Sequence, residues 1–400
     1  MRQLLSGIDR RGITTLAIGH AAADFAQGIP AALLVFLRPK LHLSYSMAAG
    51  VILACFLSSA VVQPLSGQLS DRRGSLWILS TSVLLAGTGV GLSAMAPTYP
   101  LLLLAMFVAG VGIGAFHPEA SKFARYLSGR RYASGMSLFV IGGNAGIAVA
   151  PILTSTIIIE LGFEGGVLLA VPGVLAAVLL FGQRSHLQRF APARTIAQRA
   201  PADGQWKPLA LLLAVATFRS IGWFAMVTFV PLFEILHGAS KAEGTRLLTY
   251  ILAGGAVFTL VTGPLADRFG RAAVLFGTGA VCPPLMIYYV FNRGVAGAAA
   301  ITIAGAMIIS TFGVQIVLAQ EYLPSRVALA AGLCVGVPTG LGAGFGVVLG
   351  VIADAVNLKT ALLAMAAAPA AAAFLTLFLP RPWARGAPAS ALDPAALRVP

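Results

Sequence analysis

The chain has 400 residues, of which 58% are hydrophobic and only 10% are charged, and its mean hydropathy is +0.89. A soluble domain carries roughly 25% charged residues, so this composition excludes a set of soluble domains and requires most of the surface to face lipid. The net charge of +14 has no basic domain on which to gather, so nucleic acid is not expected as a partner.

Apolar stretches of about 20 residues, the length that crosses a bilayer as a helix, recur along the whole chain. The expected spans are 13–36, 47–69, 76–96, 100–120, 134–158, 166–183, 208–234, 245–265, 272–291, 296–319, 328–352 and 359–379. The sequence therefore predicts an all-α membrane protein with twelve transmembrane helices in two pseudo-symmetric six-helix bundles. Residues 1–183 form the first bundle, the polar, basic segment 184–207 a cytoplasmic linker, and 208–400 the second bundle with a cytoplasmic tail.

Basic residues fall mainly on one side of these spans. With the N-terminus inside, most of the 27 Lys and Arg residues lie in cytoplasmic segments, and Arg219 lies inside a span. Because cytoplasmic loops are enriched in Lys and Arg, this bias predicts that both termini lie in the cytoplasm. The expected location is a bacterial inner membrane.

Two short loops, after the second and eighth spans, share one pattern about half a chain apart. They read Gly67-Gln-Leu-Ser-Asp71-Arg72-Arg73-Gly74 and Gly263-Pro-Leu-Ala-Asp267-Arg268-Phe-Gly270-Arg271. Glycine lets two helices approach closely, and Asp and Arg can pair or cap a neighbouring helix end. We predict that these loops form a gate, carried by Gly67, Asp71, Arg72, Arg73, Gly263, Asp267, Arg268 and Arg271. The alternative is a charged turn that only sets topology.

A second repeated feature lies at the junctions between the fourth and fifth helices of each half. Glu119 precedes a basic loop in the first half, and Glu321 and Arg326 stand at the matching place in the second. We expect these three residues to join the same charge cluster, with the glutamates reaching the loop arginines. Solvated loop charges are the alternative.

Polar residues inside the first span form one stripe. A charge at the bilayer centre costs about 2.5–3.5 kcal/mol on insertion scales, so such a residue is a functional hypothesis. His20, Asp24 and Gln27 lie at i, i+4 and i+7 and therefore share one helix face. Because a desolvated carboxyl group favours its protonated form, Asp24 and His20 are predicted to couple protons. A structural aspartate is the alternative.

Further candidates for substrate contact lie in other spans. Arg219 occupies nearly the place of Asp24 in the second half, so it is predicted to pair with Asp24 across a cavity or to bind an anionic substrate group. Trp223 follows one turn later, with core or lipid-facing packing as the alternative. The predicted substrate-binding residues are Gln27, His117, Asn144, Arg219 and Trp223, although helix packing is favoured for Asn144.

Two acidic residues lie at the outer ends of their spans. Glu234 and Asp354 are expected to be solvated there.

Three segments carry a resemblance to a known family. They are Gly19-His20-Ala-Ala-Ala-Asp24-Phe-Ala-Gln27-Gly28-Ile-Pro30, Phe116-His117-Pro118-Glu119-Ala-Ser121 and Ser137-Leu-Phe139-Val-Ile-Gly142-Gly143-Asn144-Ala-Gly146. With the repeated loops, they resemble the major facilitator superfamily and, within it, the fosmidomycin resistance protein family. The resemblance implies proton-driven drug export by alternating access, in a cavity lined by the first, fourth, seventh and tenth helices. The chain departs from exporter patterns at Ala150-Pro151, where Gly-Pro is usual, and lacks the fourth-helix arginine motif.

The sequence contains no P-loop, no clustered Cys/His metal site and no nucleophile triad, so no cofactor, no metal and no enzyme activity are expected. The leading hypothesis is a secondary active transporter, a proton-coupled antiporter that exports small drug-like or anionic compounds. Its expected partners are a small-molecule substrate, protons and the lipid bilayer, and it is expected to be a monomer. The alternatives are a proton-coupled uptake symporter for an organic anion or metabolite, and a membrane receptor or scaffold that does not transport.

Overall fold

The computed structural model describes residues 8–73, 76–128, 132–190, 205–323 and 327–380, and every regular element in these ranges is a helix. The first half contains α1 (Arg10–Lys40), α2 (Tyr45–Arg73), α3 (Trp77–Met95), α4 (Tyr99–Leu127), α5 (Tyr132–Gly165), the 3₁₀ helix η2 (Gly166–Ala170), α6 (Val171–Gly182) and α7 (Arg184–Gln188). The second half contains α8 (Trp206–Leu236), α9 (Lys241–Phe269), α10 (Arg271–Phe291), α11 (Val295–Ser310), α12 (Phe312–Tyr322), α13 (Val327–Ala355), α14 (Leu358–Met365) and α15 (Ala367–Thr376).

Eleven helical segments in the described ranges are long and apolar enough to cross a membrane. One of them, Leu138–Gly182, has 45 residues, which is enough for two crossings. Gly162 divides it, because its φ of 68° and ψ of −171° are not helical and glycine adopts a positive φ without a steric penalty. With this segment counted twice, the predicted all-α fold of twelve spans is confirmed.

The predicted linker, residues 184–207, lies partly outside the described residues. Its two described ends are helical: α7 spans Arg184–Gln188, and α8 begins at Trp206.

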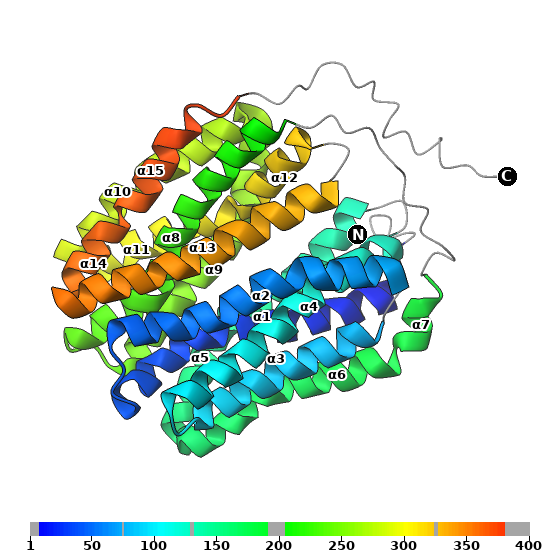
Figure 1. Cartoon of the computed structure of the whole chain (residues 1–400), viewed down its shortest axis with the longest axis horizontal. Helices are drawn as coiled ribbons and strands as arrows, with labels where there is room; N and C mark the ends of the chain where they lie inside the picture. Colours follow the sequence, from blue (N-terminus) through cyan, green and yellow to red (C-terminus); the bar gives the residue numbers. More distant parts are fainter. Residues whose placement is uncertain (1–7, 74–75, 129–131, 191–204, 324–326, 381–400) are drawn as a thin grey trace.

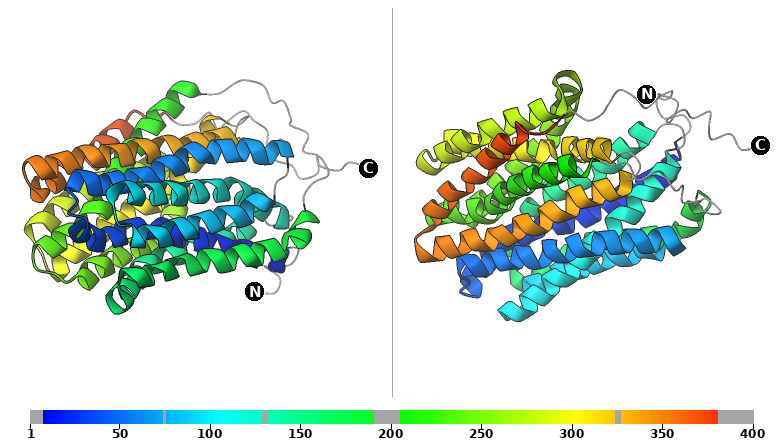
Figure 2. Two further views of the ribbon diagram at one scale, coloured as in Figure 1. Left: turned by 60° about the horizontal axis from the view of Figure 1, so that its bottom comes forward. Right: turned by 45° about the horizontal axis from the view of Figure 1, so that its top comes forward.

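The helices form two bundles, one from α1–α7 and one from α8–α15, with α2 and α13 side by side between them (Figures 1 and 2). The helix α1 begins, and α15 ends, at the same end of the molecule (Figure 1). We call this the linker end, because α6 and α8 also meet the connecting segment there. The opposite end, where α1 ends at Lys40 and α2 begins at Tyr45, is the far end.

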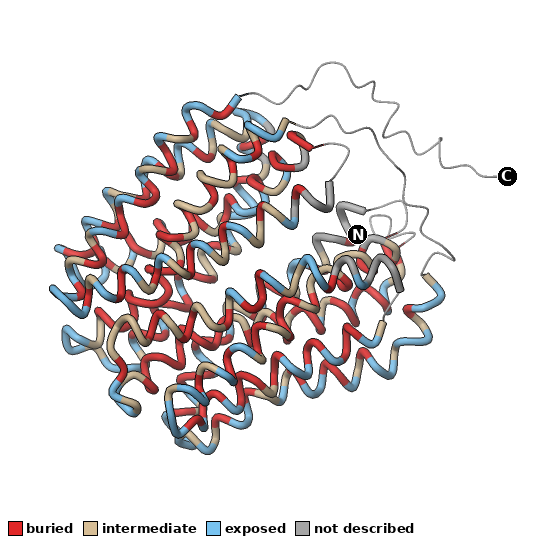
Figure 3. Tube along the Cα trace, viewed as in Figure 1, coloured by how far each residue is buried: buried red, intermediate tan, exposed pale blue. Residues whose placement is uncertain are grey.

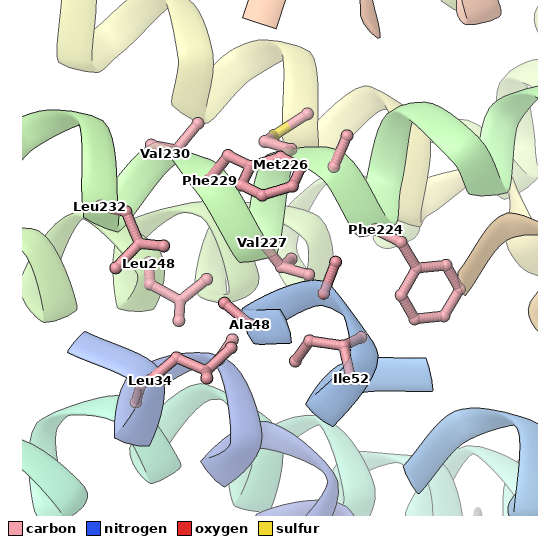
Figure 4. Packing of buried hydrophobic residues seen from close by; sticks show 14 of the residues in the cluster. Leu34, Ala48, Ile52, Phe224, Met226, Val227, Phe229, Val230, Leu232 and Leu248 are labelled. Atoms are coloured by element: carbon pink, nitrogen blue, oxygen red, sulfur yellow. The ribbon is translucent and has the colours of Figure 1, made fainter. Parts of the chain in front are cut away.

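Buried apolar side chains form three clusters, and their division shows how the halves are joined. One cluster, at the far end, contains residues of both halves, among them Leu34 and Ala48 from the first and Val227 and Leu248 from the second (Figure 4). The other two clusters each belong to a single half and lie toward the linker end. Among the described side chains, the halves therefore share one core at the far end and pack separately at the linker end.

The outward faces of the bundles are apolar and exposed. Figure 3 shows exposed residues along the outer sides of the helices, and large apolar side chains such as Leu175, Val178 and Leu260 are 65%, 67% and 78% exposed. A water-soluble protein does not expose apolar surface on this scale, whereas a lipid-facing surface requires it.

Glycine and alanine bring α3 and α4 into backbone contact. A β-carbon on Gly112 would overlap the backbone nitrogen of Ala86, and one on Gly89 would lie 2.8 Å from the carbonyl oxygen of Ala105. Because lipid gives no hydrophobic drive for helix association, small residues that permit such close packing hold membrane helices together.

We expect Gly112→Ala to destabilise the protein by about 1–3 kcal/mol, because the added methyl group meets backbone atoms that cannot rotate away. The matched control is Gly277→Ala in α10, where no described atom lies within 4 Å of the new β-carbon. That change should stabilise by roughly 0.5–1 kcal/mol through helix propensity. Thermal unfolding of purified protein, followed with a thiol-reactive dye that reports the buried Cys55, Cys282 and Cys334, measures both. Shifts of the same sign would contradict the packing argument.

Candidate functional site

The polar stripe of α1 meets α4 and α5 in the interior of the first bundle. His20 and Asp24 come from α1, one helical turn apart, and His117 comes from α4. His117 Nε2 lies 3.0 Å from Asp24 Oδ1, and His20 Nε2 lies 3.3 Å from Asp24 Oδ2. One carboxylate is therefore held between two imidazoles, and we call His20, Asp24 and His117 the triad.

Backbone carbonyl groups fix the other nitrogen of each imidazole. His20 Nδ1 lies 3.0 Å from the carbonyl oxygen of Phe139, and His117 Nδ1 lies 2.8 Å from that of Ile113. A carbonyl oxygen can only accept a hydrogen bond, so both Nδ1 atoms carry a hydrogen. The two Nε2 atoms are then the positions that gain or lose a proton beside Asp24.

The two contacts with Asp24 are hydrogen bonds only when protons are added to the triad. A bare Nε2 and a carboxylate oxygen are both acceptors and repel each other at about 3 Å. Each contact needs its own hydrogen, carried either by the imidazole or by the carboxyl group. The arrangement therefore stabilises up to two protons shared among three side chains.

The helix α5 supports the triad through Gly143 and Phe139. A β-carbon on Gly143 would overlap Asp24 Oδ2 and lie 2.6 Å from His20 Nε2, so a larger residue at this position would displace the two side chains. The ring of Phe139 stacks on the His20 imidazole with 4.1 Å between centroids and 14° between planes. No sequence pattern assigns a role to Phe139, because its contact with His20 depends on how α1 and α5 pack.

The triad is buried but not sealed. The side chains of His20, Asp24 and His117 are 9%, 14% and 26% exposed, so His117 is the member that solvent reaches most easily. The sequence shows no clustered metal site, yet the fold places the ligand atoms of these three residues within 4.8 Å of one another, close enough to hold a metal ion. Protons on the imidazoles, like a metal ion, would place positive charge beside the Asp24 carboxylate.

The structure joins His117 to Asp24, whereas the sequence grouped it with the substrate-binding candidates. No sequence pattern could make this link, because α1 and α4 are far apart in the chain. Gln27 and Asn144 are half-buried, and their amide groups form no hydrogen bond to the described residues. Trp223 is also half-buried and packs against the shared far-end core.

The predicted pairing of Arg219 with Asp24 is wrong. Arg219 is 2% exposed and turns into the second bundle. Its guanidinium donates to the carbonyl oxygens of Leu275 (3.2 Å) and Met307 (3.0 Å) and to the hydroxyl oxygens of Thr278 (3.2 Å) and Thr311 (2.5 Å). It thus ties α8 to α10 and to the junction between α11 and α12. A charge buried in this way needs several acceptors, and carbonyl and hydroxyl oxygens supply them.

Most of the predicted gate lies outside the side chains that the structure describes. The predicted residues outside them are Gly67, Asp71, Arg72, Arg73, Asp267 and Arg326. Arg268 is exposed, with its guanidinium 5.2 Å from the ring centre of Phe269. No described atom lies within 4 Å of a β-carbon built on Gly263, so the expected close helix approach is not found at that glycine.

Both glutamates at the helix junctions form ion pairs. Glu321 Oε1 lies 2.8 Å from Nη2 of Arg271, which joins α12 to the start of α10. Glu119 is 1% exposed, and its Oε2 lies 3.1 Å from Nζ of Lys122 on the same helix. These two ion pairs each lie within one half, and the part of the two glutamates in gating stays a prediction.

Asp354 is exposed, as expected, whereas Glu234 is half-buried, and both carboxylates accept hydrogen bonds. Glu234 Oε1 accepts a hydrogen bond from the hydroxyl group of Tyr289 at 2.6 Å. Asp354 accepts hydrogen bonds from the backbone N–H groups of Tyr45 and Ser46, which belong to the other half.

Comparison with known proteins decides the family. The sequence model of the Major Facilitator Superfamily matches residues 16–333. The chain belongs to the major facilitator superfamily.

Two bacterial relatives match most of this major facilitator protein. It is 28% identical over 327 residues to the fosmidomycin resistance protein of Escherichia coli (strain K12), with 80% of each chain covered. It is 27% identical over 373 residues to the uncharacterized MFS-type transporter YfnC of Bacillus subtilis (strain 168), covering 88% of this chain and 89% of the relative.

A solved structure shares the fold. A bacterial homologue of the human lysosomal transporter Spinster, in an inward-facing and occupied conformation, superposes with a TM-score of 0.77 at 15% identity, covering 93% of this chain and 96% of that chain. The protein is therefore a multi-pass membrane transporter of the major facilitator superfamily and not an enzyme, as the sequence predicts.

We expect Arg219→Lys to destabilise the substrate-free transporter by about 1–3 kcal/mol, because an ammonium group cannot reach all four acceptors and leaves buried oxygens unpaired. Thermal unfolding in detergent without any ligand measures this effect. The control is Arg246→Lys, at an exposed arginine 4.0 Å from Glu243, which should leave stability unchanged. If Arg219→Lys lowered substrate affinity while leaving stability at the wild-type value, the structural assignment of Arg219 would be wrong.

Proposed function

We propose that this protein is a proton-coupled secondary transporter of the bacterial inner membrane, that it exports small drug-like compounds, and that the triad binds the coupling protons. The observation that carries the proposal is the fixed orientation of the two imidazoles. Each histidine donates its Nδ1 hydrogen to a backbone carbonyl and presents Nε2 to the same carboxylate. Loss of protons converts two attractive contacts into two repulsive ones.

This change has the properties that coupling requires. The contact between His117 and Asp24 draws α1 and α4 together when its proton is bound and pushes them apart when that proton leaves. The triad is buried, so the surrounding low dielectric makes both the attraction and the repulsion stronger than in water. A proton taken up at the triad therefore alters the packing of the first bundle.

The proposed orientation follows from the distribution of basic residues, which assigns the linker end to the cytoplasm. The shared core at the far end then closes the side away from the cytoplasm, while the two bundles pack separately on the cytoplasmic side. In this assignment the structure is an inward-open state of an alternating-access cycle, with both termini in the cytoplasm. We propose that a single chain carries out the cycle.

The class of compound follows from the relatives more than from the site. The fosmidomycin resistance protein supports export of a drug-like molecule. Arg219 does not support the binding of an anionic substrate, because its guanidinium donates its hydrogen bonds to oxygens of its own bundle. Half-buried polar groups near the triad, Gln27 and Asn144, remain the proposed contacts for an uncharged or zwitterionic compound.

We expect Asp24→Asn to abolish proton-driven accumulation while leaving exchange of the compound across the membrane intact. The asparagine side chain keeps the size of Asp24 but cannot bind a proton or accept one from His117. The measurement is transport into proteoliposomes with and without a pH gradient, over a compound panel that includes fosmidomycin. The matched control is Glu234→Gln, which removes another half-buried acid, at the outer end of a span, and should retain accumulation.

A second variant keeps the hydrogen bond to Asp24 but removes the proton that could be released. His117→Gln can still donate a hydrogen from its amide to Asp24 but has no proton to release, so it should also lose dependence on the pH gradient. Full accumulation by both Asp24→Asn and His117→Gln would refute coupling at the triad.

The direction of transport is tested in the same system. Everted membrane vesicles with an acidic interior should accumulate the compound if the protein is an exporter. Accumulation only in right-side-out vesicles with an acidic exterior would identify the alternative, an uptake symporter. Binding without movement in either preparation would identify a receptor.

A further inference from the structure

The first turn of α2 is held by a carboxylate from the opposite half of the molecule. Asp354, in the last turn of α13, accepts hydrogen bonds from Tyr45 N at 2.6 Å and from Ser46 N at 2.9 Å, one with each carboxylate oxygen. Both donors belong to the first turn of α2, where backbone N–H groups have no partner within the helix. The helix dipole adds partial positive charge at that end, which favours an anion.

The helix α2 does not supply this charge itself. Ser44 caps it by accepting from Met47 N at 3.1 Å, and no acidic residue lies in its own first turn. The second bundle thus provides the anion that completes the start of a helix in the first bundle.

The interface between α2 and α13 is tightest where Asp354 binds. A β-carbon on Gly350 would lie 2.6 Å from Ser46 Cα, a distance at which no side chain fits. Further along the same face of α13, a β-carbon on Gly340 would lie 3.5 Å from Leu57 Cδ1, an ordinary contact. The two helices therefore make backbone contact at the far end and looser contact toward the middle.

Other contacts at the far end also cross between the halves. The ring of Tyr45 lies edge-on to Phe229 of α8, with 6.4 Å between centroids, and Lys241 Nζ of α9 lies 5.3 Å from the ring centre of Phe36. At the linker end, by contrast, the polar contacts among described residues stay within one half: Asp9 with His186, Arg11 with Gln183, and Arg271 with Glu321.

From this geometry we propose that Asp354 stabilises the closed state of the far end, and we call this contact the latch. Its carboxylate binds the N-terminus of α2 when the two halves are together at the far end and releases it when they separate there. The bond can exist only while Tyr45 and Asp354 are adjacent, so it stabilises one state of the cycle and not the other. Removal of the carboxylate therefore raises the population that is open at the far end. This inference rests on the alternating access that the proposed transport function requires.

The test measures opening of the far end directly. Ala48 on α2 is fully buried in the shared core, so an Ala48→Cys reporter reacts with a charged, membrane-impermeant methanethiosulfonate only when the halves separate there (Figure 4). The parent protein, whose three cysteines are buried, gives the background rate. The reporter is combined with Asp354→Asn, Asp354→Glu or the control Glu243→Gln. Glu243 is a far-end acid that caps its own helix α9 through Ser240 and makes no bond across the halves.

We expect Asp354→Asn to raise the reaction rate of the reporter thiol about tenfold, the effect of losing one charge-assisted contact on a two-state population. Asp354→Glu, which keeps the carboxylate on a longer side chain, should raise it less. Glu243→Gln should leave the rate at the value of the reporter alone. An unchanged rate in Asp354→Asn, or an equal rise in Glu243→Gln, would overturn the proposal.

The experiment contains no transported compound and no pH gradient. Its failure would therefore remove Asp354 from the gate without affecting proton coupling at the triad, and a failure of Asp24→Asn to change transport would leave the latch standing.

Discussion

Hydrocarbon does not solvate charge, and this one constraint accounts for the arrangement of the polar groups in the protein. Each ionisable side chain inside the spans must find its partners within the fold, because neither lipid nor an apolar neighbour can replace water. Asp24 finds two imidazoles, and Arg219 finds two carbonyl and two hydroxyl oxygens. The placement of these partners fixes how the helices of each bundle sit against one another.

The partners of Asp24 and those of Arg219 differ in whether they can gain or lose a proton. The carbonyl and hydroxyl oxygens around Arg219 do not titrate, so its bonds to α10 and the α11–α12 junction do not depend on protons. In the proposed mechanism, the contact between Asp24 of α1 and His117 of α4 depends on proton occupancy. One half thus contains a fixed polar cross-link and the other a variable one. This asymmetry contrasts with the likeness of the two helical folds.

The fold was predictable from the sequence because lipid requires long apolar helices, and these are visible as runs of residues. Which residues gather around Asp24 was only partly predictable. His20 and Asp24 share a face through the helical period alone, so their proximity follows from local geometry. The addition of His117 and the turning of Arg219 away from Asp24 depend on how separate helices rotate and pack, which no single helix encodes. For the same reason the sequence could not show that the exposed Asp354 also accepts hydrogen bonds, since its partners are backbone groups more than 300 residues earlier in the chain.

The triad lies wholly within the first bundle, so the protons that we propose it binds cannot act on the second bundle by direct contact. The signal must travel through helix packing. Two glycines of α5 bring its backbone against that of α1. A β-carbon on Gly142 would overlap the carbonyl oxygen of Ala17, and one on Gly146 would overlap that of Ala21. The two helices are therefore in direct backbone contact beside the triad. Both α1 and α5 also contact α9 of the second bundle. In the proposed mechanism, a change in the spacing of α1 and α4 would therefore reach the interface that the far-end core closes, because close-packed helices shift as units and do not deform continuously.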